Sequence, residues 1–333
     1  MLVKILKKIW SNFIIYILTF EILFQLLFFL NFDFIKQPIL FYNGYCDQKY
    51  WDLYNKKTNI DEDISYHPIL TYKKSQLIIP EKFINNKIKK EKFKKNKISL
   101  YGSSYINHKN FKKILNKSTN LKFTNYALDS YGLDQIYLSY KLTAHLNQNR
   151  TIIFGFLLED LDRSMFHFRD YQKAKFVLKN NKFYLDNVPV NLNLKPNKVN
   201  DFYLYRFLKN FYNLLTNDFD PRSSKCLLAD KKRLFEYFLK NIKKDSEKFN
   251  QKIIFITFNS KKDLIKNSNW RHQYMKNYFK KNNITHIDSL KIMKKKLSKE
   301  NEDLEEYFGS DNHNSEKSFD YIYSEFVKAY KAM

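Results

Sequence analysis

Glycine is scarce in this chain, with 5 residues among 333, whereas about 7% is usual. No glycine-rich run is present, which excludes a dinucleotide-binding or P-loop nucleotide site. The 2 cysteines, Cys46 and Cys226, are too few and too far apart for a disulfide scaffold or a zinc site of paired cysteines. Hydrophobic residues make up 44% of the chain and aromatic residues 18%. This content suffices for a packed core, so a wholly disordered chain is excluded.

Arginine is also scarce, although the net charge is +25, and the basic residues are 52 lysines and 7 arginines. Proteins that bind phosphates or base edges rely on arginine, because its planar guanidinium binds them through two hydrogen bonds. The lysines occur together with many Asn, Ile, Phe and Tyr residues, a mixture typical of compositional drift. We therefore do not expect a nucleic-acid partner.

The N-terminus contains a long apolar stretch, from Trp10 to Leu30, in which Glu21 is the single charged residue. As a helix it would span about 31 Å, roughly one hydrocarbon core. Lysines precede it, which favours a cytoplasmic N-terminus for residues 1–9 and a single-pass anchor at 10–31. A cleaved signal peptide is the alternative, but the stretch is long and residues 31–34 offer no small-residue cleavage pattern. A buried core helix is disfavoured because all its faces are apolar.

Residues 32–97 are predicted to be an irregular connecting segment, with three prolines and a run of lysines between Asn85 and Lys97. With the anchor as predicted, this segment and everything after it lie outside the cytoplasm. Cys46 and Cys226 would then meet an oxidising environment. Two interpretations stay open for them, a disulfide bond or two separate buried thiols.

From Ile98 onward, short continuous apolar runs alternate with helical patterns. The predicted strands are 98–101, 123–127, 151–156, 252–258 and 284–287, and the predicted helices are 109–117, 132–146, 228–248, 262–281 and 316–331. Such alternation indicates an α/β protein, a three-layer sandwich around a parallel sheet. The stretch from Lys175 to Val190 alternates in polarity around Asn180-Asn181, which predicts an inserted hairpin.

Three sequence blocks lie at the predicted strand ends, where parallel sheets bind ligands. They are Tyr101-Gly102-Ser103-Ser104, Asn125-Tyr126-Ala127 through Gly132, and Asp311-Asn312-His313-Asn314 before the last helix. Together and in this order they resemble the SGNH (GDSL-type) hydrolases, over residues 98–333. The resemblance implies a flavodoxin-like fold with a catalytic domain at 98–333 and an insertion at about 160–250.

The resemblance also implies site residues. Ser104 takes the position of the nucleophile, His313 that of the base which removes its proton, and Asp311 that of the carboxylate which orients the imidazole. The backbone N–H groups of Ser104 and Gly132 take two positions of the oxyanion hole, each typically worth about 3 kcal/mol. We expect no cofactor and no metal.

The chain departs from the family pattern at several positions. Ser103 stands where the family has Asp, and no Asn stands near Gly155, where the family's third oxyanion donor is expected. Glu159-Asp160 and Arg163 occur there instead and are predicted to form an ion pair that braces the loop. The closing spacing is Asp-x-His, whereas many members have Asp-x-x-His. An inactive variant of the fold therefore remains an alternative.

Other histidines are predicted to be structural. His108 follows Ser104 closely, but it falls on a predicted helix with no carboxylate nearby. His67 and His167 share no metal-ligand spacing, which argues against zinc. Asp311 has a further interpretation, as a cap of the final helix.

The leading hypothesis is a membrane-anchored serine esterase or O-acyltransferase that acts on an acylated small molecule or carbohydrate outside the cytoplasm. Envelope polysaccharide as the substrate is implied by the resemblance alone. The alternatives are an inactive fold that binds acylated glycan or scaffolds a complex, and a basic protein that binds an anionic polymer. The sequence predicts no oligomeric state.

Overall fold

The computed structural model describes residues 2–30, 63–84, 94, 96–117, 120–165, 168–169, 171–191, 204, 208, 228–265, 269–300 and 303–333. The chain divides into one unit of residues 1–57 and 193–226 and a second unit of residues 58–192 and 227–333. Cys46, Cys226, His167 and most of the lysine run at 85–97 lie outside the described residues, so the predictions made for them stay untested.

In the first unit, helix α1 (Leu2–Phe29) contains the predicted apolar stretch up to Phe29. Its segment Leu6–Leu27 is long and apolar enough to cross a membrane. Gln25 Nε2 donates to Glu21 Oε1 at 2.9 Å, and the Leu204 N–H donates to the other Glu21 oxygen at 2.9 Å. The single carboxylate of the stretch is thus hydrogen-bonded, as a polar group in apolar surroundings requires.

The second unit is built on a five-stranded sheet in the order β11-β10-β5-β3-β4, in which all pairs are parallel. The strands are β3 (Lys97–Gly102), β4 (Lys122–Asn125), β5 (Thr151–Leu157), β10 (Lys252–Phe258) and β11 (His286–Asp288). In chain order this arrangement is 2-1-3-4-5, the flavodoxin-like order. The predicted α/β sandwich is therefore confirmed, and all five predicted strands are present.

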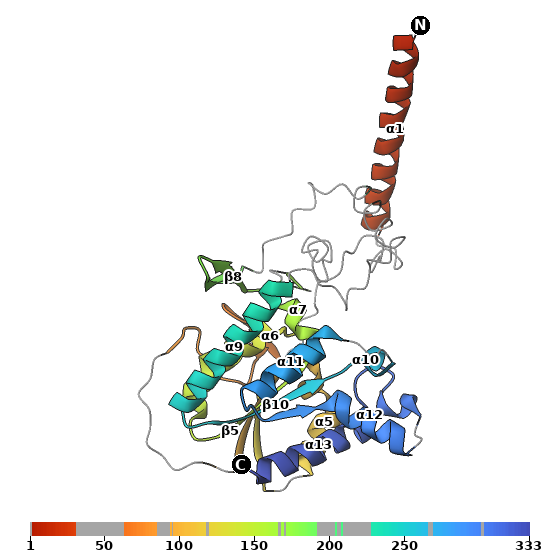
Figure 1. Cartoon of the computed structure of the whole chain (residues 1–333). Helices are drawn as coiled ribbons and strands as arrows, with labels where there is room; N and C mark the ends of the chain where they lie inside the picture. Colours follow the sequence, from red (N-terminus) through yellow and green to blue (C-terminus); the bar gives the residue numbers. More distant parts are fainter. Residues whose placement is uncertain are drawn as a thin grey trace. The chain divides into compact units, whose positions relative to one another are not determined.

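Helices cover both faces of the sheet (Figure 1). One face carries α6 (Leu133–Thr143), α9 (Leu228–Lys248) and α11 (Trp270–Lys281), and the other carries α4 (Ser104–Asn107), α5 (Lys109–Asn116), α10 (Lys261–Ile265), α12 (Ser289–Glu300) and α13 (Glu316–Lys331). In β5, Phe154 and Phe156 belong to the first core and Ile153 to the second. Because both faces are buried, apolar residues follow one another without polar alternation.

The remaining elements are short. The 3₁₀ helices are η3 (Ala144–Asn147) and η5 (Leu304–Tyr307), and α7 (Asp160–Arg163) follows β5. Three two-stranded sheets pair β1 (Ile64–His67) with β2 (Thr71–Lys74), β6 (Phe168–Arg169) with β7 (Tyr171–Gln172), and β8 (Lys175–Lys179) with β9 (Lys182–Asp186). The β8–β9 pair confirms the predicted hairpin. Asn180 and Asn181 at its turn both have positive φ, as a two-residue turn of this kind demands.

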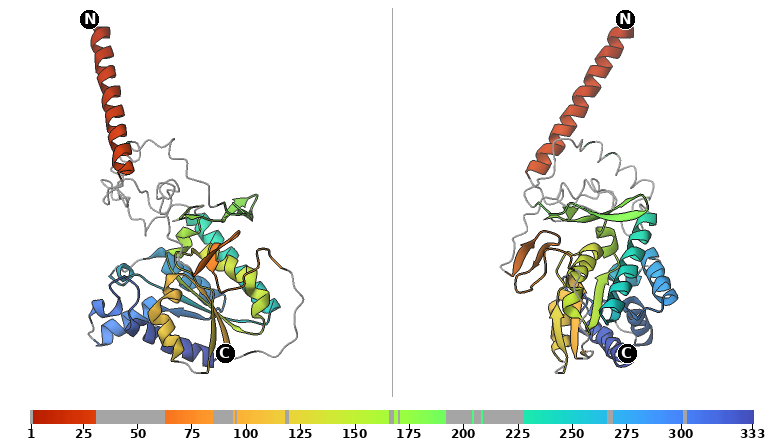
Figure 2. Two further views of the ribbon diagram at one scale, coloured as in Figure 1. Left: turned by 180° about the vertical axis from the view of Figure 1, so that it is seen from behind. Right: turned by 90° about the vertical axis from the view of Figure 1, so that its left-hand side faces the viewer.

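Two predictions about the organisation need correction. Part of the segment 32–97 is regular, because the β1–β2 hairpin places Ile69, Leu70 and Tyr72 in the core of the second unit. The Tyr66 hydroxyl also donates to Val190 O at 2.6 Å, so this hairpin lies beside the end of the β8–β9 hairpin (Figure 2). The region 160–250, predicted to be an insertion, contains α9, whose buried residues pack on the sheet, so part of this region belongs to the core.

The helices differ from the prediction at two places. The pattern at 262–281 gives two helices, α10 and α11, and the second begins after Asn269, whose side chain accepts the Arg271 N–H. Helix α12 was not predicted, although Leu290, Met293 and Leu297 have helical spacing and pack in the core.

Candidate active site

Ser104 stands just beyond the carboxyl end of strand β3. Strand β3 pairs with β4 on one side and with β5 on the other. The strand that follows β3 in the chain therefore lies on one side of it and the later strands lie on the other side, which makes β3 the switch point of the sheet. Ligands of open α/β sheets bind at such a switch point, outside the carboxyl ends of the strands. Ser104 is the first residue of α4, two residues after β3 ends at Gly102.

Two glycines allow α4 to lie directly on the strand ends. Gly102 and Gly155 are paired in register between β3 and β5. A Cβ atom on Gly102 would lie 2.2 Å from the carbonyl oxygen of Gly155, and a Cβ on Gly155 would lie 2.2 Å from Cδ1 of Ile106 in α4. Neither glycine has room for a side chain. The close packing of α4 on the ends of β3 and β5 therefore sets the position of Ser104.

The loop before α13 brings the other two predicted residues to the same place. The Gly309 N–H donates to His313 O at 2.8 Å, and the Asn312 N–H donates to Gly309 O at 3.0 Å. Asn312 has a φ of 62°, a conformation that asparagine adopts more readily than most residues. We call residues 309–314 the base loop. Its tight turn makes Asp311 and His313 point to one side.

The structure brings Ser104, His313 and Asp311 together. His313 Nε2 lies 2.9 Å from Ser104 Oγ, a hydrogen bond between residues 209 positions apart. His313 Nδ1 lies 3.6 Å from Asp311 Oδ2, too far for a hydrogen bond, while Asp311 Oδ1 accepts the His313 N–H at 3.0 Å. The Tyr105 ring packs on the His313 ring with centroids 4.8 Å apart.

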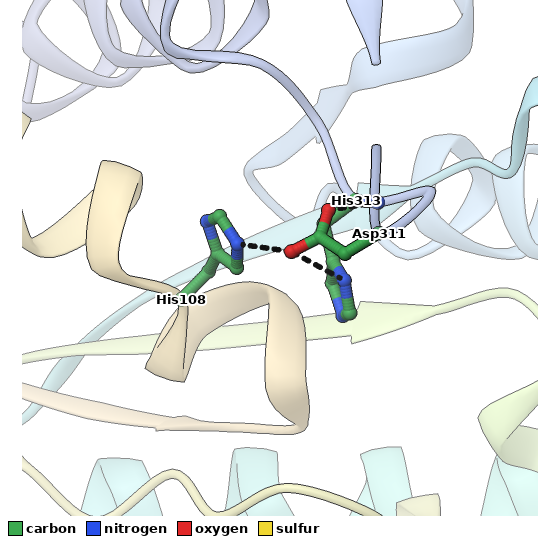
Figure 3. A group of neighbouring side chains, drawn as sticks. All are labelled: His108, Asp311 and His313. Atoms are coloured by element: carbon green, nitrogen blue, oxygen red, sulfur yellow. Dashed lines mark hydrogen bonds and ion pairs between the residues drawn. The ribbon is translucent and has the colours of Figure 1, made fainter. Parts of the chain in front are cut away.

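His108 is the residue that sequence reasoning missed. Its Nε2 lies 3.0 Å from Asp311 Oδ2, so the carboxylate lies between two imidazoles (Figure 3). The expectation that His108 has no carboxylate near it is therefore wrong. Asp311 is 203 positions away, a contact that no local pattern indicates. His108 is the N-cap of α5, and its Nδ1 accepts the Asn110 N–H at 3.3 Å.

Hydrogen bonds keep Asp311 ionised. Partial burial raises the pKa of its carboxyl group, but the hydrogen bonds from His108 and from the His313 amide outweigh this effect, so the pKa lies below its ordinary value. The side chain of Asp311 is 50% exposed, whereas that of His108 is 11% exposed. The carboxylate is therefore available as an acceptor in neutral and mildly acidic solution.

The cluster of His108, Asp311 and His313 has ligand atoms within 4.8 Å of one another, a spacing that suits a metal ion. The hydrogen bond from the Asn110 N–H to His108 Nδ1 leaves the hydrogen of this ring on Nε2, which faces Asp311 as a donor and in this tautomer offers no lone pair to a cation. His313 Nε2 faces Ser104 Oγ, and its Nδ1 faces Asp311.

The two predicted oxyanion positions differ. Ser104 begins a helix, and the first N–H groups of a helix have no acceptor within it. The Gly132 N–H instead donates to Gln135 Oε1 at 3.3 Å. Space around Gly132 is also filled, because a Cβ there would lie 3.0 Å from Cβ of Arg163. In this structure Gly132 therefore has an acceptor of its own.

The loop after β5 contains the predicted ion pair. Arg163 Nη1 lies 2.6 Å from Asp160 Oδ1, and the other Asp160 oxygen accepts the Leu157 N–H at 2.9 Å. This prediction is confirmed. Next to it, Asp162 binds Arg271 at 2.5 Å and Lys231 at 2.7 Å, and all three side chains are fully buried. The loop where the family has its asparagine is thus fixed from both sides.

His67 has the structural role expected for it. Its Nδ1 accepts the N–H groups of Ile69 and Leu70, both at 3.2 Å, and its Nε2 lies 3.1 Å from Pro80 O. Burial lowers its pKa, in keeping with a neutral ring that holds the β1–β2 turn.

Among known proteins, the chain resembles solved structures. No protein-family model matches the chain, and no curated protein matches it. Among solved structures, it is similar to the crystal structure of a member of the lipolytic protein G-D-S-L family from Veillonella parvula DSM 2008. The identity is 12%, the TM-score is 0.38, and the match covers 71% of this chain and 99% of that one. The strand order of the sheet is the flavodoxin-like order that the sequence predicts.

Proposed function

We propose that the chain is a serine hydrolase of the SGNH type, an esterase or O-acyltransferase with Ser104 as nucleophile. The observation that carries the proposal is the 2.9 Å contact between Ser104 Oγ and His313 Nε2 at the switch point of the sheet. A serine hydroxyl becomes a nucleophile when a neighbouring base removes its proton, and His313 is in place for that transfer.

In the first half of the reaction, Ser104 Oγ attacks the carbonyl carbon of an ester while His313 Nε2 takes the hydroxyl proton. The ester carbonyl oxygen becomes an oxyanion, for which the Ser104 N–H is a donor. The bond to the leaving alcohol then breaks, and His313 returns the proton to the alcohol oxygen. The product is an ester between the acyl group and Ser104.

In the second half, water or a sugar hydroxyl attacks the acyl-enzyme with His313 again as base, and the Ser104 hydroxyl is restored. Asp311 stabilises the imidazolium that forms in both halves. The Gly132 N–H takes part only when Gln135 gives up its hydrogen bond. The choice between water and a sugar hydroxyl decides between hydrolysis and transfer.

Helix α1 supports a membrane location for the proposed enzyme. The apolar segment Leu6–Leu27 anchors the chain in a membrane, and the lysines before it favour a cytoplasmic N-terminus. The site then faces outward, where O-acyl groups of envelope polysaccharides are a suitable substrate. Cys46 and Cys226 share this environment.

The test uses the full-length chain in detergent, with a small acetyl ester as substrate and a fluorophosphonate probe for the serine. We expect ester hydrolysis and labelling of Ser104, and a loss of more than about a thousandfold in Ser104→Ala and in His313→Ala. Ser103→Ala is the matched control, because this neighbouring hydroxyl is buried and has no hydrogen-bond partner among the described residues. A wild-type chain no faster than Ser104→Ala would contradict the proposal.

A second candidate function is a non-catalytic SGNH fold that binds acylated glycan. It is favoured by the Gly132 N–H, which already donates to Gln135, and by the absence of an asparagine from residues 156–163, directly after Gly155. The probe distinguishes the two, because a binding protein would leave Ser104 unlabelled while it retains acetylated glycan on a column.

A further inference from the structure

Asp311 is half exposed, although its proposed role requires a carboxylate that is held in place beside His313. Its side chain is 50% exposed and belongs to a turn, so nothing about its own backbone fixes the second carboxylate oxygen. That oxygen, Oδ2, lies 3.6 Å from His313 Nδ1 and 3.0 Å from His108 Nε2. The closer contact is therefore with the histidine outside the base loop.

His108 is built as a rigid donor. As the N-cap of α5 it accepts the Asn110 N–H at Nδ1, and this bond leaves the hydrogen on Nε2, which faces Asp311. The His108 ring packs beside the Phe319 ring, with centroids 5.8 Å apart, and beside the His313 ring, with centroids 5.0 Å apart. The start of a helix thus sets both the tautomer and the direction of the donor.

We propose that His108 is a positioning residue, which holds the Asp311 carboxylate beside Nδ1 of His313. The inference rests on the proposed function of the site. When His313 takes the Ser104 proton at Nε2, its ring gains a positive charge and Nδ1–H becomes a stronger donor. A carboxylate that is already in place stabilises this charge without first having to move. His108 exchanges no proton in the step.

Two substitutions separate this role from helix capping. The amide of asparagine ends near the place of Nδ1, so His108→Asn keeps the cap, for which asparagine is well suited, and removes the donor to Asp311. The amide of glutamine reaches near the place of Nε2, so His108→Gln keeps a donor to Asp311 and weakens the cap. A purely structural role predicts that activity follows stability in both variants.

We expect the opposite pattern from the full-length chain with the acetyl ester. In His108→Asn, kcat falls about 10- to 100-fold, as for a misplaced catalytic group, while KM and Tm stay near the wild-type values. In His108→Gln, most of the kcat returns although Tm falls by about 2–4 °C. Ile114→Val is the stability control, because this buried α5 residue lies outside the site.

A double-mutant cycle links the effect to Asp311. In an Asp311→Asn background, His108→Asn is expected to cause no further loss, since the two residues act through one contact. Equal kcat values for wild type and His108→Asn, or additive losses in the cycle, would overturn the inference while the proposed function stands. A wild-type chain that neither hydrolyses the ester nor is labelled at Ser104 would contradict both the proposed function and the inference about His108.

Discussion

The two halves of the candidate site are held in place by different forces. The nucleophile turn, residues 102–106, is held by packing, since Gly102, Gly155 and Ile106 meet without room for one more carbon atom. The base loop, residues 309–314, is held by hydrogen bonds, and its Asp311 is half exposed. Substitutions at the turn should therefore act mainly through stability, and substitutions in the loop mainly through activity.

The largest effect is expected for Gly102→Ala. The added Cβ would lie 2.2 Å from a backbone oxygen of β5, so a strand has to move, and the cost lies at or above the upper end of about 1–3 kcal/mol for overpacking. Denaturant unfolding measures this loss, and ester hydrolysis falls with it because Ser104 is displaced. A change in stability below about 0.5 kcal/mol would show that packing does not fix the turn.

Ile106 provides the control for this prediction. A Cβ on Gly155 would meet Cδ1 and Cγ1 of Ile106, both closer than 2.5 Å, whereas a Cβ on Gly102 would first meet the Gly155 carbonyl oxygen. Ile106→Ala should therefore relieve most of the damage of Gly155→Ala and little of that of Gly102→Ala. Equal rescue of both would point to side-chain crowding as the common cause.

The second prediction concerns the pH dependence of stability. We expect it to arise outside both halves of the site, at His286 in the edge strand β11. Burial lowers the pKa of His286 to about 4, from about 6.5 in the unfolded chain. The unfolded state thus binds more protons between these values, so stability is lost as the pH falls from about 6.5 toward 4. The expected loss between pH 7.5 and pH 5 is about 2 kcal/mol.

His286→Gln tests this assignment, because glutamine is neutral throughout and can keep a hydrogen bond to Thr257 Oγ1, which lies 2.8 Å from His286 Nε2. Unfolding free energies measured across the pH range should be flatter for the variant by about the same 2 kcal/mol. Burial also lowers the pKa of His67, so a residual slope remains. An unchanged slope in His286→Gln would assign the acid sensitivity elsewhere.

Strands were easier to predict than the elements around them. Buried parallel strands such as Thr151–Leu157 and Lys252–Phe258 are uninterrupted apolar runs, and the sequence places them to within a residue. The β1–β2 hairpin was missed because each strand has four residues and its core residues lie around the turn. Helix α12 was missed because lysines surround its few apolar positions.

The sequence could predict only those site residues that belong to recognisable blocks next to predicted strands and helices. Ser104 and His313 follow from their blocks at strand and helix ends, and the structure brings them within hydrogen-bond distance. The contact between His108 and Asp311 depends on where α5 begins relative to a turn 203 residues later. The acceptor of the Gly132 N–H is different, because Gln135 stands three residues after the N-cap of α6, and this spacing is a capping-box signal that the sequence offered.

The smallest effect on stability is expected for Gly309→Ala in the base loop. Its backbone conformation is open to other residues, and the added Cβ would lie 3.1 Å from Asp311 Oδ1. An exposed carboxylate can move aside by a few tenths of an ångström, so the free energy of unfolding should change by less than about 0.5 kcal/mol. The same movement takes Asp311 away from His313 and should lower kcat about three- to tenfold. A variant with wild-type kcat would mean that the site tolerates a displaced carboxylate. Substitutions in the base loop would then not act mainly through activity, which would contradict the contrast with the nucleophile turn.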